Sequence, residues 1–265
     1  MHTEIISCDS RQFYQELNIG VARPTSEELS AAPHHFIACR SVTNPFNVFT
    51  YEQEAIKTLD SIFRNHDTAI AVGGSGLYIE ALCHGIALLP DPSPELRASL
   101  QHKLQTEGIG SLRLMLHDLD PQYYSQVDLS NGVRIQRALE VCLTTGKPYS
   151  QVIQQPRAER PFKIQPIFIE RTRDELRERI NQRVTAMMQD GLEQEAERLF
   201  PLRYLNTLNT VGYKEFFNLW DTKVSPFPLP EAQIKQVSDA ICLNTWHYAK
   251  KQLTWLKKFS LNFQS

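Results

Sequence analysis

The chain has 265 residues, of which 42% are hydrophobic and 22% are charged, as is ordinary for a folded globular protein. This composition excludes a disordered chain, and the length allows a sizeable core in one large domain or two smaller ones. With 28 Lys and Arg against 30 Asp and Glu, the net charge is −2. A wholly basic nucleic-acid coat is therefore excluded, although a local basic face is not.

The sequence carries no membrane or export signal. No apolar run approaches the roughly 18 residues of a membrane span, and the start, residues 1–4, is not a basic-then-apolar signal segment. The five cysteines are far apart, odd in number and without a C-x-x-C pair. We therefore expect reduced thiols, a cytoplasmic location, and neither a membrane partner nor a metal held by these residues.

The first third of the chain alternates β-rich runs with helical patterns. Strands are predicted at residues 4–8 and 68–72, with a further candidate at 36–39. Helices are predicted over residues 12–17 and over a segment from Thr50, where a capping-box pattern reaches Gln53. The strand at 68–72 ends in a glycine turn that continues into a helix over 77–83, a succession that predicts a parallel α/β sheet.

A linker and a helical insertion follow. Three prolines in residues 89–94 indicate the linker. Beyond it, three helices are predicted, over residues 95–106, 111–116 and 132–145, the last after a Ser130-Asn131 cap.

The remaining sequence returns to the sheet. Residues 163–169 alternate as a strand does, the pattern Thr172-x-x-Glu175 begins a helix that ends at Gly191, and residues 231–259 are helical. The predicted parts are therefore an α/β core over residues 1–88, a helical insertion over 89–160, and a return strand with a helical C-terminal section over 161–265.

Four polar residues, Asp9 to Gln12, directly follow the first predicted strand. Ligands of open α/β sheets bind at the carboxyl ends of the strands, so this segment is a candidate site. Asp9 can accept a proton there, and the Gln12 amide can read a base edge as donor and acceptor. The alternative is that Asp9 and Ser10 only cap a helix.

The glycine turn at residues 73–76 is a second candidate. Its glycines allow backbone N–H groups to approach an anion at a helix N-terminus. The alternative is a tight strand-to-helix turn without a ligand. No G-x-x-x-x-G-K-[ST] phosphate loop occurs in the sequence, so that type of diphosphate site is absent from this chain.

Two helices carry clustered cations. The helix over 172–190 holds Arg173, Arg177, Arg179 and Arg183 beside an apolar stripe. Such arginines can clamp a diphosphate or line an RNA groove. The alternative, which we favour for most of them, is a solvated face paired with Glu175 and Glu178. Arg134 and Arg137 in the helix over 132–145 have the same two interpretations.

The last predicted helix interleaves lysines with aromatic residues, namely Lys250, Lys251, Lys257 and Lys258 with Trp246, Tyr248 and Trp255. Cations contact phosphates and aromatic faces stack on splayed bases, so the pattern suits single-stranded or loop RNA. The alternative is an amphipathic helix whose aromatic residues belong to the core.

In this order, several stretches resemble one family, the bacterial tRNA dimethylallyltransferases. They are residues 4–12 (EIISCDSRQ), 19–20 (IG), 23–25 (RPT), 33–35 (PHH), 72–79 (VGGSGLYI), 137–141 (RALEV), 145–148 (TGKP), 211–215 (VGYKE) and 249–255 (AKKQLTW). The resemblance covers nearly the whole chain. It implies an α/β fold: a P-loop-NTPase-like parallel sheet core with a helical insertion domain and a helical C-terminal section.

The resemblance also implies an activity. Family members transfer a dimethylallyl group from dimethylallyl diphosphate, held with Mg²⁺, to N6 of an adenosine. That adenosine lies 3′-adjacent to the anticodon of tRNAs that read codons starting with U, and the base is flipped into a channel to be reached. The implied partners are dimethylallyl diphosphate and the tRNA anticodon stem-loop, which the insertion would grip. We expect a monomer.

The resemblance assigns roles by position. Asp9 is the expected general base, and Arg183 is the expected arginine at the diphosphate. The expected tRNA contacts are Asp9, Ser10, Arg11, Gln12, Ser75, Arg97, Val133, Arg134, Ile135, Gln136, Arg137, Asn209, Thr210, Val211, Gly212, Tyr213, Lys214, Lys250, Lys251, Gln252, Trp255 and Lys257.

The sequence departs from the family pattern in three places. The family's first strand and its G-P-T-[AG]-x-G-K-[ST] loop do not precede Asp9, so we expect a shortened form with weak diphosphate binding and little activity. An arginine of the family is Trp246 here, which removes one cation from the tRNA face. The family's H-P-N-D run is Asp128-Leu129-Ser130-Asn131 here, without the histidine.

Three functions are compatible with these observations. The first is tRNA prenyl transfer. The second is a non-catalytic tRNA-binding remnant that keeps the basic insertion and the last helix. The third is prenyl transfer to free adenylate, which would need no tRNA-gripping insertion.

Overall fold

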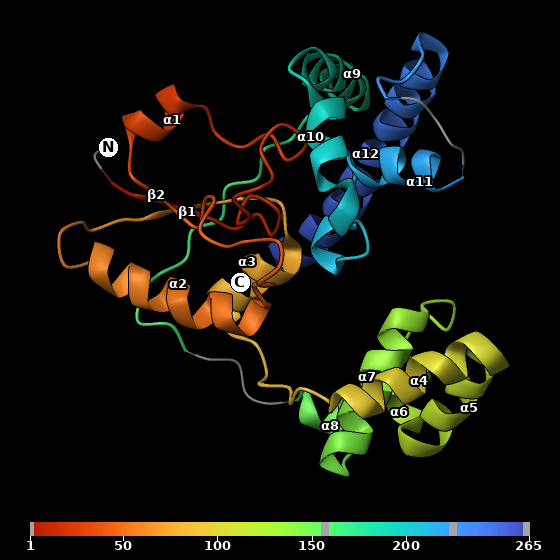
Figure 1. Cartoon of the computed structure of the whole chain (residues 1–265). Helices are drawn as coiled ribbons and strands as arrows, with labels where there is room; N and C mark the ends of the chain where they lie inside the picture. Colours follow the sequence, from red (N-terminus) through yellow and green to blue (C-terminus); the bar gives the residue numbers. More distant parts are fainter. Residues whose placement is uncertain (1–2, 155–158, 223–226, 262–265) are drawn as a thin grey trace. The chain divides into compact units, whose positions relative to one another are not determined.

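The computed structural model describes residues 3–154, 159–222 and 227–261 (Figure 1). The chain forms two compact units: residues 1–83 with 160–265, called here the α/β unit, and residues 84–159, called the helical unit. The helical unit begins at His84, whereas the sequence prediction began the insertion at residue 89. Met1 and His2, part of the segment in which no export signal was found, lie outside the described residues.

The α/β unit is built on a small parallel sheet. Strand β1 (Ile5–Ser7) lies between β2 (His34–His35) and β3 (Ile70–Val72), and both pairings are parallel. Ile6 of the central strand is fully buried. The α/β class and the strands predicted at residues 4–8 and 68–72 are therefore confirmed. The candidate strand at residues 36–39 does not form, and β2 lies just before it.

Two predicted elements of this unit do not form. Residues 12–17 make turns instead of a helix, because Tyr14 bridges to Arg40 and the Gln12 side chain donates to the carbonyl of Ala22 at 3.0 Å. Residues 163–169 have no strand structure, since the outer edge of β3 pairs with none of the described segments. A lone extended segment leaves its backbone groups without partners, and Ile167 is accordingly 84% exposed.

The rest of the α/β unit is mainly helical. The helices are α1 (Ser26–Ala31), α2 (Val48–Ile62), α3 (Gly76–His84), α9 (Arg173–Gln189), α10 (Leu192–Leu199), α11 (Lys214–Thr222) and α12 (Glu231–Ser260), with 3₁₀ turns at Phe200–Leu202 and Asn206–Leu208. One core cluster packs Phe13, Phe36 and Tyr51 around β1 and α2, and a second joins α9 to α12.

The two predicted helix starts in this unit have different outcomes. Helix α9 begins with the predicted capping box, in which Glu175 N donates to Thr172 Oγ1 at 3.2 Å and Thr172 N to the Glu175 carboxylate at 2.9 Å. Helix α2 begins earlier than predicted, because Asn47 is its N-cap and accepts from Thr50 N at 2.8 Å. The box from Thr50 to Gln53 is therefore wrong.

The helical unit contains α4 (Pro94–Glu107), α5 (Ile109–Leu119), α6 (Pro121–Tyr124), α7 (Gly132–Thr145) and α8 (Tyr149–Val152). Leu112, Leu116 and Leu139 are fully buried between α4, α5 and α7, which makes a core separate from those of the α/β unit. Helix α7 has the predicted bounds and is capped by Asn131. No helix among the described residues of either unit has the length and apolarity to cross a membrane.

Candidate functional site

The candidate site begins at the tip of the central strand. Asp9 follows β1 at the carboxyl end of the sheet, where α/β proteins bind ligands. Its carboxylate accepts the Arg11 backbone N–H at 2.9 Å, and its own N–H donates to Ser7 Oγ at 3.3 Å. Asp9 therefore holds a local turn, and the helix that it was alternatively predicted to cap is absent from this segment.

The glycine turn packs directly on this strand tip. A Cβ on Gly73 would lie 2.5 Å from the carbonyl carbon of Cys8, so only glycine lets the two backbones approach so closely. Ser10 N donates to Ser75 Oγ at 3.0 Å, and the two hydroxyls lie 3.0 Å apart. Close packing of protein on protein explains this turn, which favours the interpretation of a tight turn over that of an anion cradle.

Helix α12 borders the same turn. Gln252 Nε2 donates to the Gly74 carbonyl at 2.8 Å, and the Tyr248 hydroxyl lies 3.5 Å from that oxygen. Burial raises the pKa of Tyr248, and the negative charge of Asp9 raises it further. Asp9, Tyr248 and Gln252 are therefore gathered around the turn, although 239 or more residues separate Asp9 from the other two along the chain.

Arg183 on α9 lies close enough to Asp9 for their charges to interact. Crowding by protein atoms lowers the pKa of the Arg183 guanidinium, and the Asp9 carboxylate opposes that change. The charges of the two residues predicted to act on the substrates therefore interact, although no hydrogen bond or ion pair joins them within the described part of the chain.

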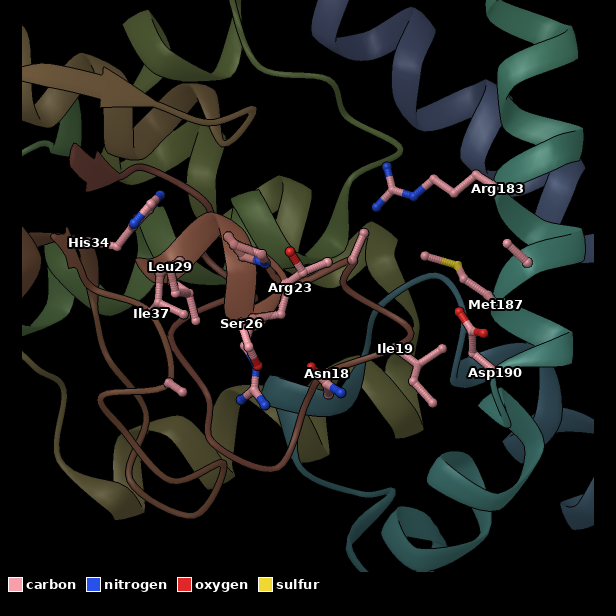
Figure 2. A pocket seen from close by; sticks show the side chains of 15 residues that line it. Asn18, Ile19, Arg23, Ser26, Leu29, His34, Ile37, Arg183, Met187 and Asp190 are labelled. Carbon is pink, nitrogen blue, oxygen red and sulfur yellow. The ribbon is translucent and has the colours of Figure 1, made fainter. Parts of the chain in front are cut away.

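Arg183 also lines a cavity of about 750 Å³ between α9 and the segment over residues 18–38, which contains α1 and β2 (Figure 2). Figure 2 shows Arg183 and Met187 extending from α9, with Leu29 and Ile37 on the opposite wall. The wall combines apolar side chains with a few polar groups, as small-molecule sites do. Asp9 is not among the residues that line this cavity.

Ser10 and Arg11 line a second cavity of about 350 Å³. The Arg11 guanidinium donates to the carbonyls of Thr207 at 2.8 Å and Asn209 at 3.4 Å, so it ties the strand tip to the turn before α11. Gln12, expected to read a base, instead donates to the Ala22 carbonyl and accepts from Ser7 Oγ at 3.2 Å. In this structure the side chains of Arg11 and Gln12 therefore donate hydrogen bonds to backbone carbonyls of neighbouring loops.

The predicted contact segment from Asn209 to Lys214 is partly interior. Tyr213 is fully buried and donates from its hydroxyl to Glu195 at 2.5 Å. Glu195 also accepts the backbone N–H groups of residues 18–20 at 3.0 to 3.2 Å. A Cβ on Gly20 would lie 2.5 Å from the Tyr213 ring. The expected side-chain contact of Tyr213 with tRNA is therefore corrected: its ring secures the loop at Gly20.

The other residues of that segment differ in accessibility. Asn209 is exposed, whereas Thr210, Val211 and Lys214 are half-buried. Gly212 is buried with φ of 104°, a conformation that favours glycine, and its N–H donates to Glu215 at 2.8 Å. The exposed end of the segment therefore lies at Asn209, next to the carbonyls that hold Arg11.

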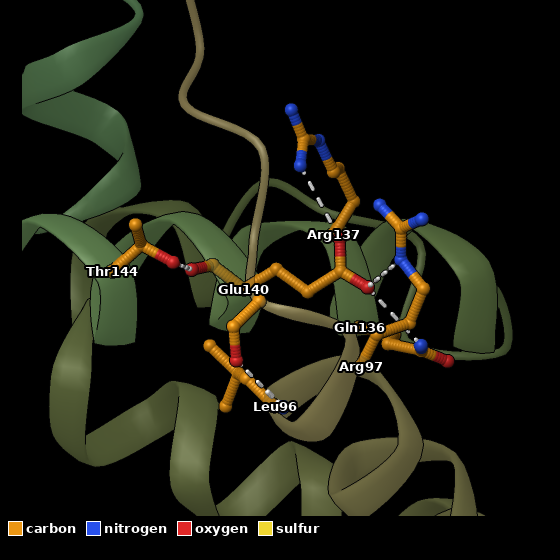
Figure 3. A network of polar contacts seen from close by, with 7 residues as sticks. Leu96, Arg97, Gln136, Arg137, Glu140 and Thr144 are labelled. Atoms are coloured by element: carbon orange, nitrogen blue, oxygen red, sulfur yellow. Dashed lines mark hydrogen bonds and ion pairs between the residues drawn. The ribbon is translucent and has the colours of Figure 1, made fainter.

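In the helical unit, two predicted tRNA-contacting arginines share one buried carboxylate (Figure 3). Glu140 is 4% exposed and accepts from Arg97 Nε at 3.4 Å, Arg137 Nη1 at 3.2 Å and Gln136 Nε2 at 3.2 Å. Each arginine keeps other N–H groups that Glu140 does not use. Arg97 and Arg137 are thus held in place and also partly neutralised.

The other predicted tRNA-contact residues on α7 differ in exposure. Val133 is 81% exposed, and Arg134 beside it is also exposed. Ile135 is fully buried in the core of the helical unit, so its expected contact with tRNA is corrected to a packing role. Of the predicted contact residues on this helix, Val133, Arg134, Gln136 and Arg137 are therefore at least partly accessible.

The α9 arginines 173, 177 and 179 are exposed, as expected for a solvated face, but none of them forms an ion pair with Glu175 or Glu178 among the described residues, and Arg179 acts on Glu175 only through its charge. The Glu175 carboxylate accepts from Thr172, and the Glu178 carboxylate accepts from Gln182 at 2.8 Å. Arg173 and Arg177 instead lie over the ring of Trp246 on α12. On the same helix, Lys250, Lys251 and Lys257 are exposed, and Trp255 is half-buried and stacks on Phe259 with a ring separation of 4.6 Å.

The residues present do not form a metal site by themselves. Across the described segments, no group of three or more His, Cys, Asp or Glu residues could hold a metal ion. Divalent ions such as Mg²⁺ are bound through carboxylates together with substrate phosphates. Binding of Mg²⁺ therefore stays a prediction.

Sequence reasoning assigned no role to two residues of the site. Glu140 had one available signal, its position three residues after Arg137 on a helix. Glu195 had none, because its partners lie on other elements of the chain. Such contacts become visible only when the fold brings distant segments together.

The fold and site define an α/β protein with a polar strand tip next to an arginine-lined cavity, and comparisons identify its relatives. Residues 12–259 match the family described as IPP transferase. A protein of Christiangramia forsetii named tRNA dimethylallyltransferase is 44% identical over 97% of this chain and 82% of its own length. A protein of Phocaeicola vulgatus named tRNA dimethylallyltransferase 1 is 43% identical over 97% of this chain and 83% of its own.

Solved structures agree with these matches. The tRNA isopentenylpyrophosphate transferase of Bacillus halodurans superposes with a TM-score of 0.64 at 29% identity, covering 96% of this chain and 78% of its own. A eukaryotic dimethylallyltransferase acting on tRNA has the same fold, with a TM-score of 0.71 at 21% identity over 96% of this chain and 63% of its own. The chain therefore belongs to the IPP transferase family, and the predicted P-loop-NTPase-like core is confirmed.

Proposed function

We propose that this chain is a tRNA prenyltransferase. It transfers a dimethylallyl group from dimethylallyl diphosphate to N6 of the adenosine 3′-adjacent to the anticodon, in tRNAs that read codons starting with U. One observation carries the assignment within the family: Asp9, at the carboxyl end of the central strand, interacts electrostatically with Arg183 at the edge of a cavity. The transfer needs a base and a cation, and the charges of these two residues interact.

The reaction uses the two charges for opposite tasks. The adenine N6 attacks the first carbon of the dimethylallyl group, the bond from that carbon to the diphosphate oxygen breaks, and the diphosphate leaves with its electron pair. The N6 nitrogen loses a proton to the Asp9 carboxylate, because the neutral amine is a poor nucleophile. The Arg183 guanidinium stabilises the negative charge that develops on the diphosphate.

The surroundings of these two residues suit the two substrates. Ile19, Leu29, Ile37 and Met187 give the cavity beside Arg183 an apolar wall for the five-carbon group. The adenosine must leave its base stack to reach Asp9. Exposed Arg134 and the arginines on Glu140 give the helical unit cations for the anticodon stem-loop.

Three further parts of the proposal concern the conditions of the reaction. All five cysteines carry free thiols, which supports a reducing compartment, and we place the activity in the cytoplasm. Mg²⁺ would accompany the diphosphate as a substrate-bound ion. The enzyme acts as a monomer, and light scattering of the purified chain tests this.

The decisive experiment substitutes Asp9 with alanine. Single-turnover transfer is measured with enzyme and dimethylallyl diphosphate in excess over tRNA, so that weak diphosphate binding does not hide the chemical step. We expect D9A to lower the rate by about 10²- to 10⁴-fold, the usual contribution of a general base. Binding of tRNA, measured separately, should change little.

A matched control is Asp60→Ala on the exposed face of α2. This substitution should leave the rate unchanged. A D9A rate equal to that of the unsubstituted chain would remove Asp9 from the mechanism. Equal transfer to AMP and to tRNA would replace the proposal with prenylation of free adenylate, and binding of tRNA without transfer would leave a tRNA-binding remnant.

A further inference from the structure

Three cations gather over one indole ring on the face where α9 packs against α12. The guanidinium carbon of Arg177 lies 4.9 Å from the centre of the Trp246 ring, that of Arg173 lies 5.5 Å away, and Lys250 Nζ lies 6.0 Å away. Trp246 is half-buried and packs against the core of the α/β unit. Packing therefore fixes one part of the ring, and the three cations around it are exposed.

The charges of this cluster are not offset by carboxylates. In the portion of the chain that the structure describes, no ion pair involves Arg173, Arg177 or Lys250. Of the acids on the same turns, Glu175 and Glu178 accept hydrogen bonds from Thr172 and Gln182, and Asp174 is exposed beside Arg173. An aromatic face attracts cations through its quadrupole without cancelling their charge. The three cations over the ring are therefore held together without a paired carboxylate in the described part of the chain.

Its place on α9 relates the cluster to the candidate site. Arg177 and Arg173 precede Arg183 by six and ten residues on one helix. At 1.5 Å per residue, they lie roughly 9 and 15 Å from Arg183 along the helix axis. An RNA whose adenosine reaches Asp9 therefore has backbone phosphates within reach of this cluster. The free N–H groups of stacked guanidiniums can chelate phosphate oxygens.

We propose that Arg173, Arg177 and Lys250, held over Trp246, form a binding site for backbone phosphates of the tRNA. This inference rests on the proposed function, since it takes tRNA as the partner. The site contacts phosphate only, so it adds affinity for any RNA stem-loop and no base specificity. Trp246 is its positioning residue: the ring keeps three like charges together that would otherwise separate.

The test measures binding of a fluorescent tRNA to the whole chain by anisotropy over a series of salt concentrations. Arg177→Ala should weaken binding about 5- to 10-fold at low salt and reduce the slope of log affinity against log salt by about one. Trp246→Leu keeps every charge and should still weaken binding about 3-fold. Arg177→Lys keeps the charge and should restore most of the affinity.

The matched control is Arg179→Ala, which removes an exposed arginine of the same helix that is not over the ring. Its affinity should stay within about twofold of the unsubstituted chain. An Arg177→Ala affinity equal to that of the unsubstituted chain overturns the site, as does an equal loss in Arg179→Ala, which would indicate only a general field. If the unsubstituted chain binds no tRNA, the proposed function fails instead.

Discussion

The arginines of the two units are held in opposite ways. In the helical unit, Arg97 and Arg137 share the buried carboxylate of Glu140, which offsets one of their two charges (Figure 3). In the α/β unit, Arg173 and Arg177 lie on the neutral ring of Trp246, which offsets none. A buried carboxylate costs desolvation and needs partners, so the arginines beside it first stabilise the fold.

This difference gives each set of cations a separate expected effect. Removing the carboxylate that pairs with an arginine should lower the stability of the helical unit. Removing an unpaired arginine should leave stability unchanged and alter only what the protein binds or transfers. The comparison is wrong if substitutions in the two units have the same effects on the free energy of unfolding and on tRNA binding or prenyl transfer.

The largest effect is expected at Arg183. Arg183→Gln removes the guanidinium that interacts with Asp9. The negative charge that develops on the leaving diphosphate is then no longer stabilised by this cation. Loss of one such group costs about 10²- to 10³-fold in rate, which single-turnover transfer measures. Arg183 interacts with Asp9 only through longer-range electrostatics and forms no ion pair among the described residues, so the urea midpoint should change little.

Arg183→Lys is the companion variant, since it keeps the charge and loses the planar fork. Its rate should fall between those of the glutamine variant and the unsubstituted chain. A full rate in Arg183→Gln would show that the diphosphate is held elsewhere. A lowered urea midpoint would show that Arg183 is a structural residue like those on Glu140.

The next effect is expected at Glu140. Glu140→Gln replaces a buried anion with a neutral amide and weakens the hydrogen bonds to Arg97 and Arg137. The free energy of unfolding of the helical unit should fall by about 1–2 kcal/mol. All three tryptophans, at positions 220, 246 and 255, belong to the α/β unit, so circular dichroism should show the loss while tryptophan fluorescence does not.

The control for this variant is Glu107→Gln in the same unit. Glu107 is exposed and pairs with Lys103 at 2.6 Å, so its loss should cost no more than about 0.5 kcal/mol. Equal losses at positions 107 and 140 would mean that burial of Glu140 adds nothing. The contrast between the two units would then lack its physical basis.

Sequence reasoning succeeded where the information is local. The start of α9 is determined by Thr172 and Glu175, three residues apart, and α7 starts after Asn131, so both helices were predicted closely. The strand tip at Asp9 also followed from its place after an apolar run. These features depend on neighbours in the chain and on general rules for parallel sheets.

It failed where distant partners decide the outcome. The alternating pattern at residues 163–169 predicted a strand, but a strand needs a neighbour and none of the described segments supplies one. The burial of Tyr213 depends on Glu195 and Gly20, which belong to other parts of the chain. The α9 arginines were expected to pair with Glu175 and Glu178, whose carboxylates the structure shows bonded to Thr172 and Gln182.

The smallest effect is expected at the start of α9, which carries both Arg173 and Arg183. The backbone and hydroxyl of Thr172 donate to Glu175 and lower its pKa from the ordinary 4.5. Because the folded pKa is depressed, this contribution is fully present above the unfolded value and is lost as pH falls through the folded one. The Thr172 amide donates to this carboxylate, so its exchange protection should drop as the pH falls below 4.5.

Two variants decide whether this drop belongs to the capping box. Glu175→Gln should remove the pH dependence of the Thr172 amide, because an uncharged amide does not titrate in this range. Glu178→Gln, one turn along the same exposed face, should keep it, since Glu178 accepts from Gln182 and from no other described residue. A drop that persists in Glu175→Gln would move its cause to another acid. The orientation of Arg173 over Trp246 would then not depend on how the helix begins.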